Sequence, residues 1–174
     1  WAIDRVANGG APIKVRLVKG ANLEMEKTES SFHHWPLATY HTKLDTDANY
    51  KKILLEILDQ KSAPALNVGV ASHNVFDLAF ALNLVKEQEI ESHVDFEMLE
   101  GMANELVYEL LRQNVNLLLY TPIVKRENYN SAIAYLVRRL DEGTQKGNFL
   151  KEGFQLKTNT KKWEEIRKQF TDSI

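Results

Sequence analysis

Four short apolar runs alternate along the chain with segments in which apolar residues recur every three or four positions. Val and Leu are frequent in these runs, which span Ile13–Lys19, Ala65–Ser72, Val94–Leu99 and Asn116–Tyr120. Runs of this length and composition predict strands that are buried on both faces, as in a parallel sheet.

The segments between the runs predict helices. In the clearest one, residues at i, i+3, i+4, i+7 and i+8 form one apolar stripe that faces a core; they are Tyr50, Ile53, Leu54, Ile57 and Leu58. Asp45, Thr46 and Asp47 lie just before this stripe and suit a helix N-terminus. The same reasoning predicts helices at Val75–Lys86, Ala103–Arg112 and Ser131–Asp141, and shorter ones at Leu23–Ser31 and around Trp163, Ile166 and Phe170.

Strands that alternate with helices indicate βα units and an α/β fold. A doubly wound sheet and a (βα)8 barrel both fit, but no GxGxxG turn supports a nucleotide-binding doubly wound sheet. A complete barrel needs about 250 residues. We therefore expect the C-terminal part, about half, of a TIM-like barrel in residues 1–150, with an amphipathic tail helix in 151–174. Half a barrel has two open sheet edges, which favour self-association.

Composition narrows the function mainly by exclusion. The net charge of −2 gives no basic field for nucleic acid, and the absence of cysteine excludes thiolate chemistry and fits a reducing compartment. No apolar stretch approaches the roughly 18 residues that span a bilayer. The five histidines show no HxxxH or HxH spacing, so no metal site is predicted.

Polar residues stand at or just after the carboxyl ends of the predicted strands, where barrel enzymes build their active sites. These residues are Arg16, Lys19, His73, Asn74, Glu97 and Tyr120. Any one of them can be explained by the polarity of loops, and His73 equally by a structural hydrogen bond. The repetition at four strands favours a site.

Two opposed stripes run along the predicted helix at Ser131–Asp141. One is apolar and is expected to face a core; it consists of Ile133, Leu136, Val137 and Leu140. The other consists of Tyr135, Arg138, Arg139 and Glu142. Two guanidinium groups on one face suit a carboxylate or phosphate. From the spacing alone, however, an ordinary solvated and salt-bridged surface is the preferred interpretation.

A family likeness extends from about residue 13 to 150. It rests on six motifs in order: VRLVKGA (15–21), WPLATYHTKLDTDANY (35–50), VASHN (70–74), FEMLEGM (96–102), LLLYTP (117–122) and AYLVRRLDE (134–142). Together they resemble the proline dehydrogenase domain of bacterial PutA-type proteins. The resemblance implies an FAD-dependent barrel that oxidises L-proline to Δ1-pyrroline-5-carboxylate, and in many members a following aldehyde dehydrogenase domain.

The resemblance also implies roles for individual residues. Arg16 would lie near the flavin N5, and Arg138 and Arg139 would bind the proline carboxylate, with Glu142 bracing Arg139. Tyr120 and Tyr135 would enclose the proline ring, and Tyr120 is, with Arg16, a predicted catalytic residue. The remaining FAD contacts would come from Lys19, Gly20, Ala21, Lys43, Thr46, His73, Asn74, Glu97 and Leu99, together with Arg139 and Glu142.

Two positions depart from the family pattern. Asn22 stands where an aromatic residue is frequent, and Glu97 stands where Gln is common, so the carboxylate of Glu97 needs a partner. The resemblance also implies strands upstream of the first motif, with a catalytic Lys and an Asp near the substrate. We therefore expect a barrel fragment that is inactive alone and needs its missing N-terminal half.

The resemblance further implies a bacterial cytoplasmic protein, peripheral to the inner membrane where electrons pass to quinone. Two other functions stay open on the residues alone. One is a non-catalytic partial barrel that serves as an interaction module, and the other is a different barrel enzyme that acts on a carboxylated substrate.

Overall fold

The computed structural model of the chain describes residues 1–20, 23–144, 149 and 156–174, without the side chains of 141–144. Its strands are β1 (Ile13–Leu17), β2 (Leu66–Ala71), β3 (Val94–Leu99) and β4 (Asn116–Tyr120). Its helices are α1 (Ala2–Ala7), α2 (Leu23–His33), α3 (Lys43–Ile57), α4 (Val75–Glu87), α5 (Asn104–Arg112), α6 (Tyr129–Thr144) and α8 (Lys161–Thr171), with 3-10 turns η1 (Glu91–His93) and η2 (Arg126–Asn128).

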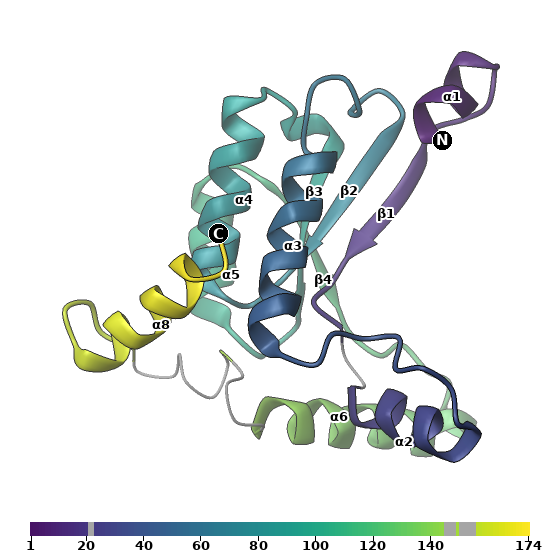
Figure 1. The fold of residues 1–174 in the computed structure, drawn as a ribbon, viewed down its shortest axis with the longest axis vertical. Helices are drawn as coiled ribbons and strands as arrows, with labels where there is room; N and C mark the ends of the chain where they lie inside the picture. Colours follow the sequence, from purple (N-terminus) through teal and green to yellow (C-terminus); the bar gives the residue numbers. More distant parts are fainter. Residues whose placement is uncertain (21–22, 145–148, 150–155) are drawn as a thin grey trace.

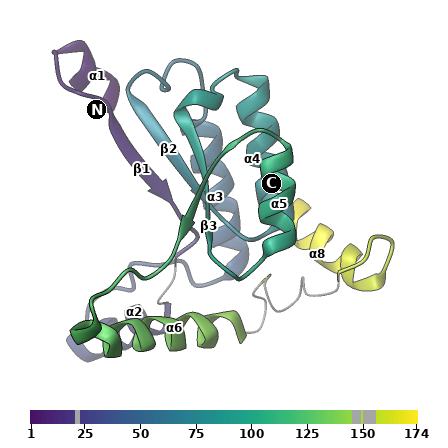
Figure 2. The same cartoon turned by 180° about the vertical axis from the view of Figure 1, so that it is seen from behind.

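The four strands form one parallel sheet in the order β1-β2-β3-β4, so each strand pairs with the next in the chain. Helices α3 and α4 lie together on one face of this sheet (Figures 1 and 2). The α/β fold predicted from the alternating pattern is confirmed, and β3 and β4 have the predicted bounds. The sheet leaves β1 and β4 as its two edges.

The core lies between the two central strands and the helices α3, α4 and α5. Leu54 of α3, Val85 of α4 and Phe96 of β3 are almost completely buried there. Successive residues of a strand point to opposite faces, so one face supplies this core while the other is free to carry polar groups. On β1 and β3 that second face carries Lys14, Arg16, Asp95 and Glu97.

Helix α3 begins earlier than the sequence pattern indicates. Asp45, Thr46 and Asp47 were expected at its N-terminus, but Thr42 is the N-cap, and its Oγ1 accepts a hydrogen bond from the Asp45 backbone N–H at 3.1 Å. Thr42 Oγ1 in turn donates to the Asp45 carboxylate at 2.6 Å. The polar run therefore forms the first turn of the helix itself, where an acidic side chain is favourable to the helix dipole.

The apolar stripe of α6 does not face a core, so that expectation is wrong for the described chain. Its four residues are between 44% and 66% exposed: Ile133, Leu136, Val137 and Leu140. Among the described side chains of this helix, the buried one is Ala132. The reason is the placement of α6, which lies with α2 past the carboxyl ends of the strands instead of covering the sheet (Figures 1 and 2).

The tail helix α8 returns to the outer side of the βα units. Its Phe170 ring lies 5.7 Å from the Phe76 ring and 6.0 Å from the Phe80 ring, both on α4, and Ile166 is buried. The prediction of an amphipathic packing helix in the tail is confirmed, whereas the domain boundary at residue 150 stays a prediction. Over the described ranges, no helix is both long enough and apolar enough to cross a membrane.

Replacing Leu54 by Ala tests the core. Leu54 is 0% exposed, so Leu54→Ala should lower the free energy of unfolding by about 2–5 kcal/mol, through lost burial and the cavity left behind. Urea unfolding followed by circular dichroism measures this change. Leu55→Ala is the matched control, because Leu55 is 54% exposed on the same helix. Equal losses in the two variants would contradict the assigned core.

Candidate active site

An ion pair between β1 and β3 crosses the intervening strand β2. Arg16 Nε donates to Glu97 Oε2 at 2.5 Å, although β1 and β3 are next-nearest neighbours and lie about 9.5 Å apart. The pair can form because Gly69 of β2 stands between them. A Cβ added at Gly69 would collide with the Glu97 carboxylate, so the missing side chain provides the space that the carboxylate occupies.

The guanidinium of Arg16 is held from a second side by Tyr120. Its carbon lies 4.6 Å from the centroid of the Tyr120 ring, a cation–π geometry. Arg16 thus contacts a carboxylate from β3 and an aromatic ring from β4, and 41% of its side chain stays exposed. Arg16, Glu97 and Tyr120 were each predicted from the sequence, and the structure brings them together.

A second cation shares the Glu97 carboxylate. Lys14 Nζ lies 2.5 Å from Asp95 Oδ2 and 3.5 Å from Glu97 Oε1. The hydrogen bond to Asp95 raises the pKa of Lys14 above its ordinary value, against a smaller opposing effect of burial. Glu97 is 1% exposed, and burial of an unpaired carboxylate is costly. The two cations of β1, Lys14 and Arg16, therefore offset the free-energy cost of burying the Glu97 carboxylate.

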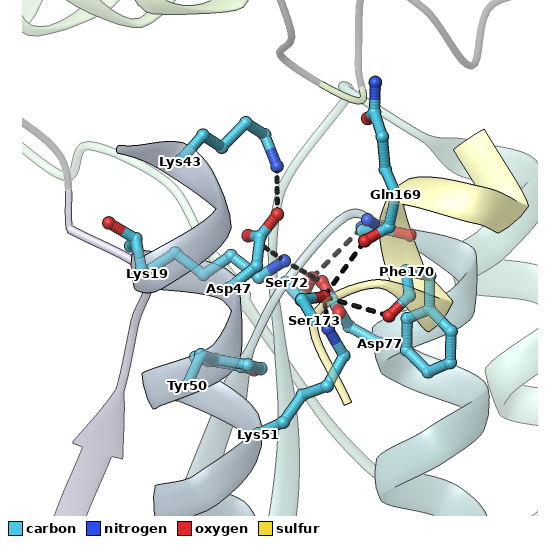
Figure 3. Close-up of polar contacts among 12 residues, drawn as sticks. Lys19, Lys43, Asp47, Tyr50, Lys51, Ser72, Asp77, Gln169, Phe170 and Ser173 are labelled. Atoms are coloured by element: carbon cyan, nitrogen blue, oxygen red, sulfur yellow. Dashed lines mark hydrogen bonds and ion pairs between the residues drawn. The ribbon is translucent and has the colours of Figure 1, made fainter. Parts of the chain in front are cut away.

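Lys19 and Lys43 meet in a second polar cluster, shown in Figure 3. Lys19 Nζ lies 2.5 Å from Asp77 Oδ2 and 2.8 Å from Asp47 Oδ1, and Lys43 pairs with Asp47 as well. Burial alone would raise the pKa of Asp47, but the two lysines outweigh it and hold this pKa below its ordinary value. Two of the predicted cofactor residues thus share one carboxylate.

The tail helix closes this cluster from the outside. Lys51 of α3 is buried, donates to Ser173 Oγ and lies with its Nζ 4.5 Å from the centroid of the Phe170 ring (Figure 3). Burial lowers the pKa of Lys51 below its ordinary value. Among the described residues, Lys19, Lys43 and Lys51 lie with the two carboxylates of Asp47 and Asp77, so this described cluster has a formal excess of one positive charge, three minus two.

The residues that follow β2 make structural contacts. His73 Nε2 accepts a hydrogen bond from the backbone N–H of Leu99 at 3.0 Å, which ties the ends of β2 and β3 together. Asn74 is the N-cap of α4, and its side-chain oxygen accepts from the Phe76 N–H at 3.0 Å. His73 thus makes a structural hydrogen bond of the kind weighed from the sequence, and the predicted cofactor contacts of His73 and Asn74 stay predictions.

The other predicted site residues make local contacts or are exposed. Thr46 donates to the Thr42 carbonyl within the first turn of α3, and Gly20 has a φ of +88°, which glycine adopts without strain. On α6 the guanidinium carbon of Arg139 lies 5.3 Å from the Tyr135 ring centroid, and Arg138 is exposed. Ala21 and the side chain of Glu142 lie outside the described residues.

Comparison with known proteins identifies the family. The sequence profile described as proline dehydrogenase matches residues 1–152. The chain is 30% identical over 154 residues to proline dehydrogenase 1, mitochondrial, of Dictyostelium discoideum, and 32% identical over 129 residues to proline dehydrogenase 2 of Bacillus subtilis. The matches cover 84% and 74% of this chain. The chain belongs to the proline dehydrogenase family.

Solved structures of proline utilization A (PutA) show the same fold. The one from Corynebacterium freiburgense is 40% identical with a TM-score of 0.81, over 99% of this chain and 16% of that chain. The one from Bdellovibrio bacteriovorus, inactivated by N-propargylglycine, is 28% identical, also with a TM-score of 0.81, over 98% of this chain and 17% of that chain. The chain spans 26% and 36% of the two curated proline dehydrogenases. Its four-stranded sheet therefore matches part of a TIM-like barrel.

Sequence reasoning missed several charged residues of this proline dehydrogenase family chain: Lys14, Lys51, Asp47, Asp77 and Asp95. One signal was available, because Lys14 and Arg16 are two residues apart on β1 and Asp95 and Glu97 are two residues apart on β3. Such spacing puts each pair on one face of its strand. Over the described ranges, no group of three or more His, Asp or Glu side chains is placed to hold a metal ion.

Gly69→Ala tests the crossing over β2. The new methyl group would displace the Glu97 carboxylate, so the free energy of unfolding should fall by about 1–3 kcal/mol, as for other overpacked sites. Chemical denaturation measures the loss. In a Glu97→Ala background the same Gly69→Ala change should cost clearly less, since the two sites are coupled. Equal costs in both backgrounds would contradict the steric role of Gly69.

His73→Gln tests the hydrogen bond to Leu99 through its pH dependence. Burial lowers the pKa of His73 below 6.5, so below that pH the unfolded chain binds a proton that the folded chain does not. The wild-type free energy of unfolding should therefore fall as the pH drops from 6.5 toward the lowered pKa, by up to about 1.4 kcal/mol per pH unit.

The Gln oxygen can still accept from Leu99 but does not titrate, so His73→Gln should lose this part of the pH dependence. Unfolding curves at neutral and mildly acidic pH provide the measurement. His41→Gln is the control, because His41 is exposed and its replacement should leave the wild-type slope in place. An unchanged slope in His73→Gln would rule out the assignment.

Proposed function

We propose that this chain is part of the catalytic barrel of an FAD-dependent enzyme that oxidises L-proline to Δ1-pyrroline-5-carboxylate. The observation that carries the proposal is the cluster of Arg16, Glu97 and Tyr120, which unites three strands of a proline dehydrogenase family sheet. In TIM-like barrels, residues near the carboxyl ends of several strands make the active site together.

The residues present suit FAD. Arg16 offers a half-exposed guanidinium, and Lys43 offers a half-exposed amine beside a cluster with one excess positive charge. A pyrophosphate is anionic, so cations that are held in place but still open to solvent are the appropriate donors. When bound, FAD would supply the acceptor for the hydride that leaves the proline carbon next to nitrogen.

The roles of the chain's own residues follow from their chemistry. Arg16 would stabilise negative charge that develops on the cofactor, because a preorganised cation acts without reorganisation during the reaction. Arg138 and Arg139 would bind the proline carboxylate, and Tyr135, whose ring already contacts Arg139, would cover the apolar part of proline. Fixing the carboxylate orients the reacting carbon, which is a large part of catalysis by positioning.

The chain alone is proposed to be incomplete. Its sheet has two edge strands, and both are largely exposed along their length. These edges suit further strands of the same barrel, and they also favour a second candidate, a partial barrel that associates with another chain. The whole enzyme, its FAD site and its further domains therefore belong to a longer protein under this proposal.

Addition of L-proline to the full-length protein tests the function. The purified protein should carry an oxidised-flavin absorbance that L-proline bleaches in the absence of another electron acceptor. Flavin that binds but does not respond to millimolar proline would favour a barrel enzyme for another carboxylated substrate. Protein that binds no added FAD but self-associates in sizing experiments would favour the interaction module.

Arg138→Met and Arg139→Met sharpen the same test. Each should raise KM for proline by about tenfold to a hundredfold, with a smaller change in kcat, since a hydrogen bond to a charged group contributes about 1.5–3 kcal/mol. Arg112→Met is the matched control, because Arg112 is an exposed residue of α5 that pairs with Glu109. An unchanged KM in both α6 variants would refute the carboxylate role.

A further inference from the structure

The contacts of Glu97 restrict the Arg16 guanidinium in position and in charge. Glu97 Oε2 lies 2.5 Å from Arg16 Nε, and the carboxylate is fixed in turn by the space over Gly69. The Tyr120 ring covers the guanidinium from another strand. Arg16 therefore has one defined orientation, which is set by groups from β2, β3 and β4 and not by its own strand.

The charges on this face of the sheet nearly cancel. Lys14 and Arg16 carry two positive charges, and Asp95 and Glu97 carry two negative ones. Glu97 is the buried member, and its carboxylate is directly bonded to Arg16, whereas Asp95 is bonded to Lys14. At a given distance, a buried charge interacts more strongly with a neighbouring charge than a solvated one does, because the dielectric constant around it is lower. Glu97 thus offsets the Arg16 charge more than any other described residue on this face.

We propose that Glu97 is a positioning residue that fixes Arg16 and, by offsetting its charge, lowers the reduction potential of the bound flavin. This inference rests on the proposed function, in which Arg16 stabilises negative charge on the reduced cofactor. With Glu97 ionised, Arg16 is already paired with a carboxylate when the flavin gains negative charge on reduction, so it stabilises that charge less. With a neutral amide in its place, the same cation would favour reduction more strongly.

Glu97→Gln in the full-length holoenzyme separates charge from shape. The amide oxygen can still accept from Arg16 Nε, and the released cations Arg16 and Lys14 are both partly exposed, so water can solvate them. The flavin potential, measured by redox titration against reference dyes, should become more positive by at least the equivalent of a tenfold change in the reduced-to-oxidised ratio, about 30 mV for two electrons.

Asp95→Asn is the matched control. It also converts a carboxylate of β3 into an amide two residues away on the same face, but Asp95 is bonded to Lys14 and not to Arg16. Asp95→Asn should change the reduced-to-oxidised flavin ratio by less than about threefold, because the charge that it removes is farther from Arg16 and more solvated than that of Glu97. An equal shift in the two variants would assign the effect to general charge and would overturn the proposal.

Lys14→Met is a second variant, and its expected shift of the flavin potential has the opposite sign to that of Glu97→Gln. Lys14 shares the Glu97 carboxylate and is 43% exposed, so its removal is compatible with folding and leaves that carboxylate to Arg16 alone. The flavin potential should become more negative. Thermal unfolding of each holoenzyme checks that the variants are folded.

The outcomes separate this proposal from the proposed function. A wild-type protein that binds no flavin, or whose flavin proline does not bleach, defeats the function itself. A wild-type flavin that proline does bleach, with a potential that Glu97→Gln leaves in place, defeats only the role of Glu97. The expected pattern is a positive shift for Glu97→Gln, a small one for Asp95→Asn and a negative one for Lys14→Met.

Discussion

The charge pair between Arg16 and Glu97 is the constraint around which the candidate site is organised. It joins strands that are not neighbours in the sheet, and it requires a glycine on the strand between them. Three strands must therefore be in register before the pair can form. The pair in turn gives a buried carboxylate the compensation without which burial would be unfavourable. Fold and site are linked through this one contact, because neither its geometry nor its charge balance survives a shift of one strand.

The second polar cluster follows a different logic. Lys19 follows β1, Asp47 belongs to α3 and Asp77 to α4, so its ion pairs join a strand exit to two covering helices. The two carboxylates hold the lysines in place without cancelling them completely. A residual positive charge on a rigid framework is a favourable arrangement for an anionic ligand. The two clusters thus differ in net charge. The group around Arg16 and Glu97 is near neutral, whereas the group around Lys19 keeps a surplus of positive charge.

The elements of the fold were largely predictable, because they depend on local apolar periodicity. The bounds of β3 and β4 were predicted correctly, and α4 and α5 within about one residue. The start of α3 was wrong because a Thr side chain caps the helix before the acidic run. The stripe on α6 was misassigned because periodicity shows that a helix has an apolar face but not what lies against it.

The candidate site was predictable only in part. Arg16, Glu97 and Tyr120 could be named from strand ends and family motifs, but their contact depends on Gly69, whose importance is visible only when the register is known. Asp77 and Lys51 act through partners far away in sequence, and no motif spacing encodes such pairs. His73 was placed correctly at a strand end, yet its partner is a backbone amide of the next strand.

The strand order carries a consequence for synthesis. Each strand pairs with the one made just before it, and each pairing is joined by a crossover that holds at least one helix. A sheet of this kind can lengthen by one βα unit at a time while the chain leaves the ribosome, without waiting for a distant partner. The charge pair over Gly69 skips a strand, so it can form only after β3 has been added, one unit after β1 and β2 have paired. The cluster of Arg16, Glu97 and Tyr120 is therefore completed only with β4, the last strand of the sheet.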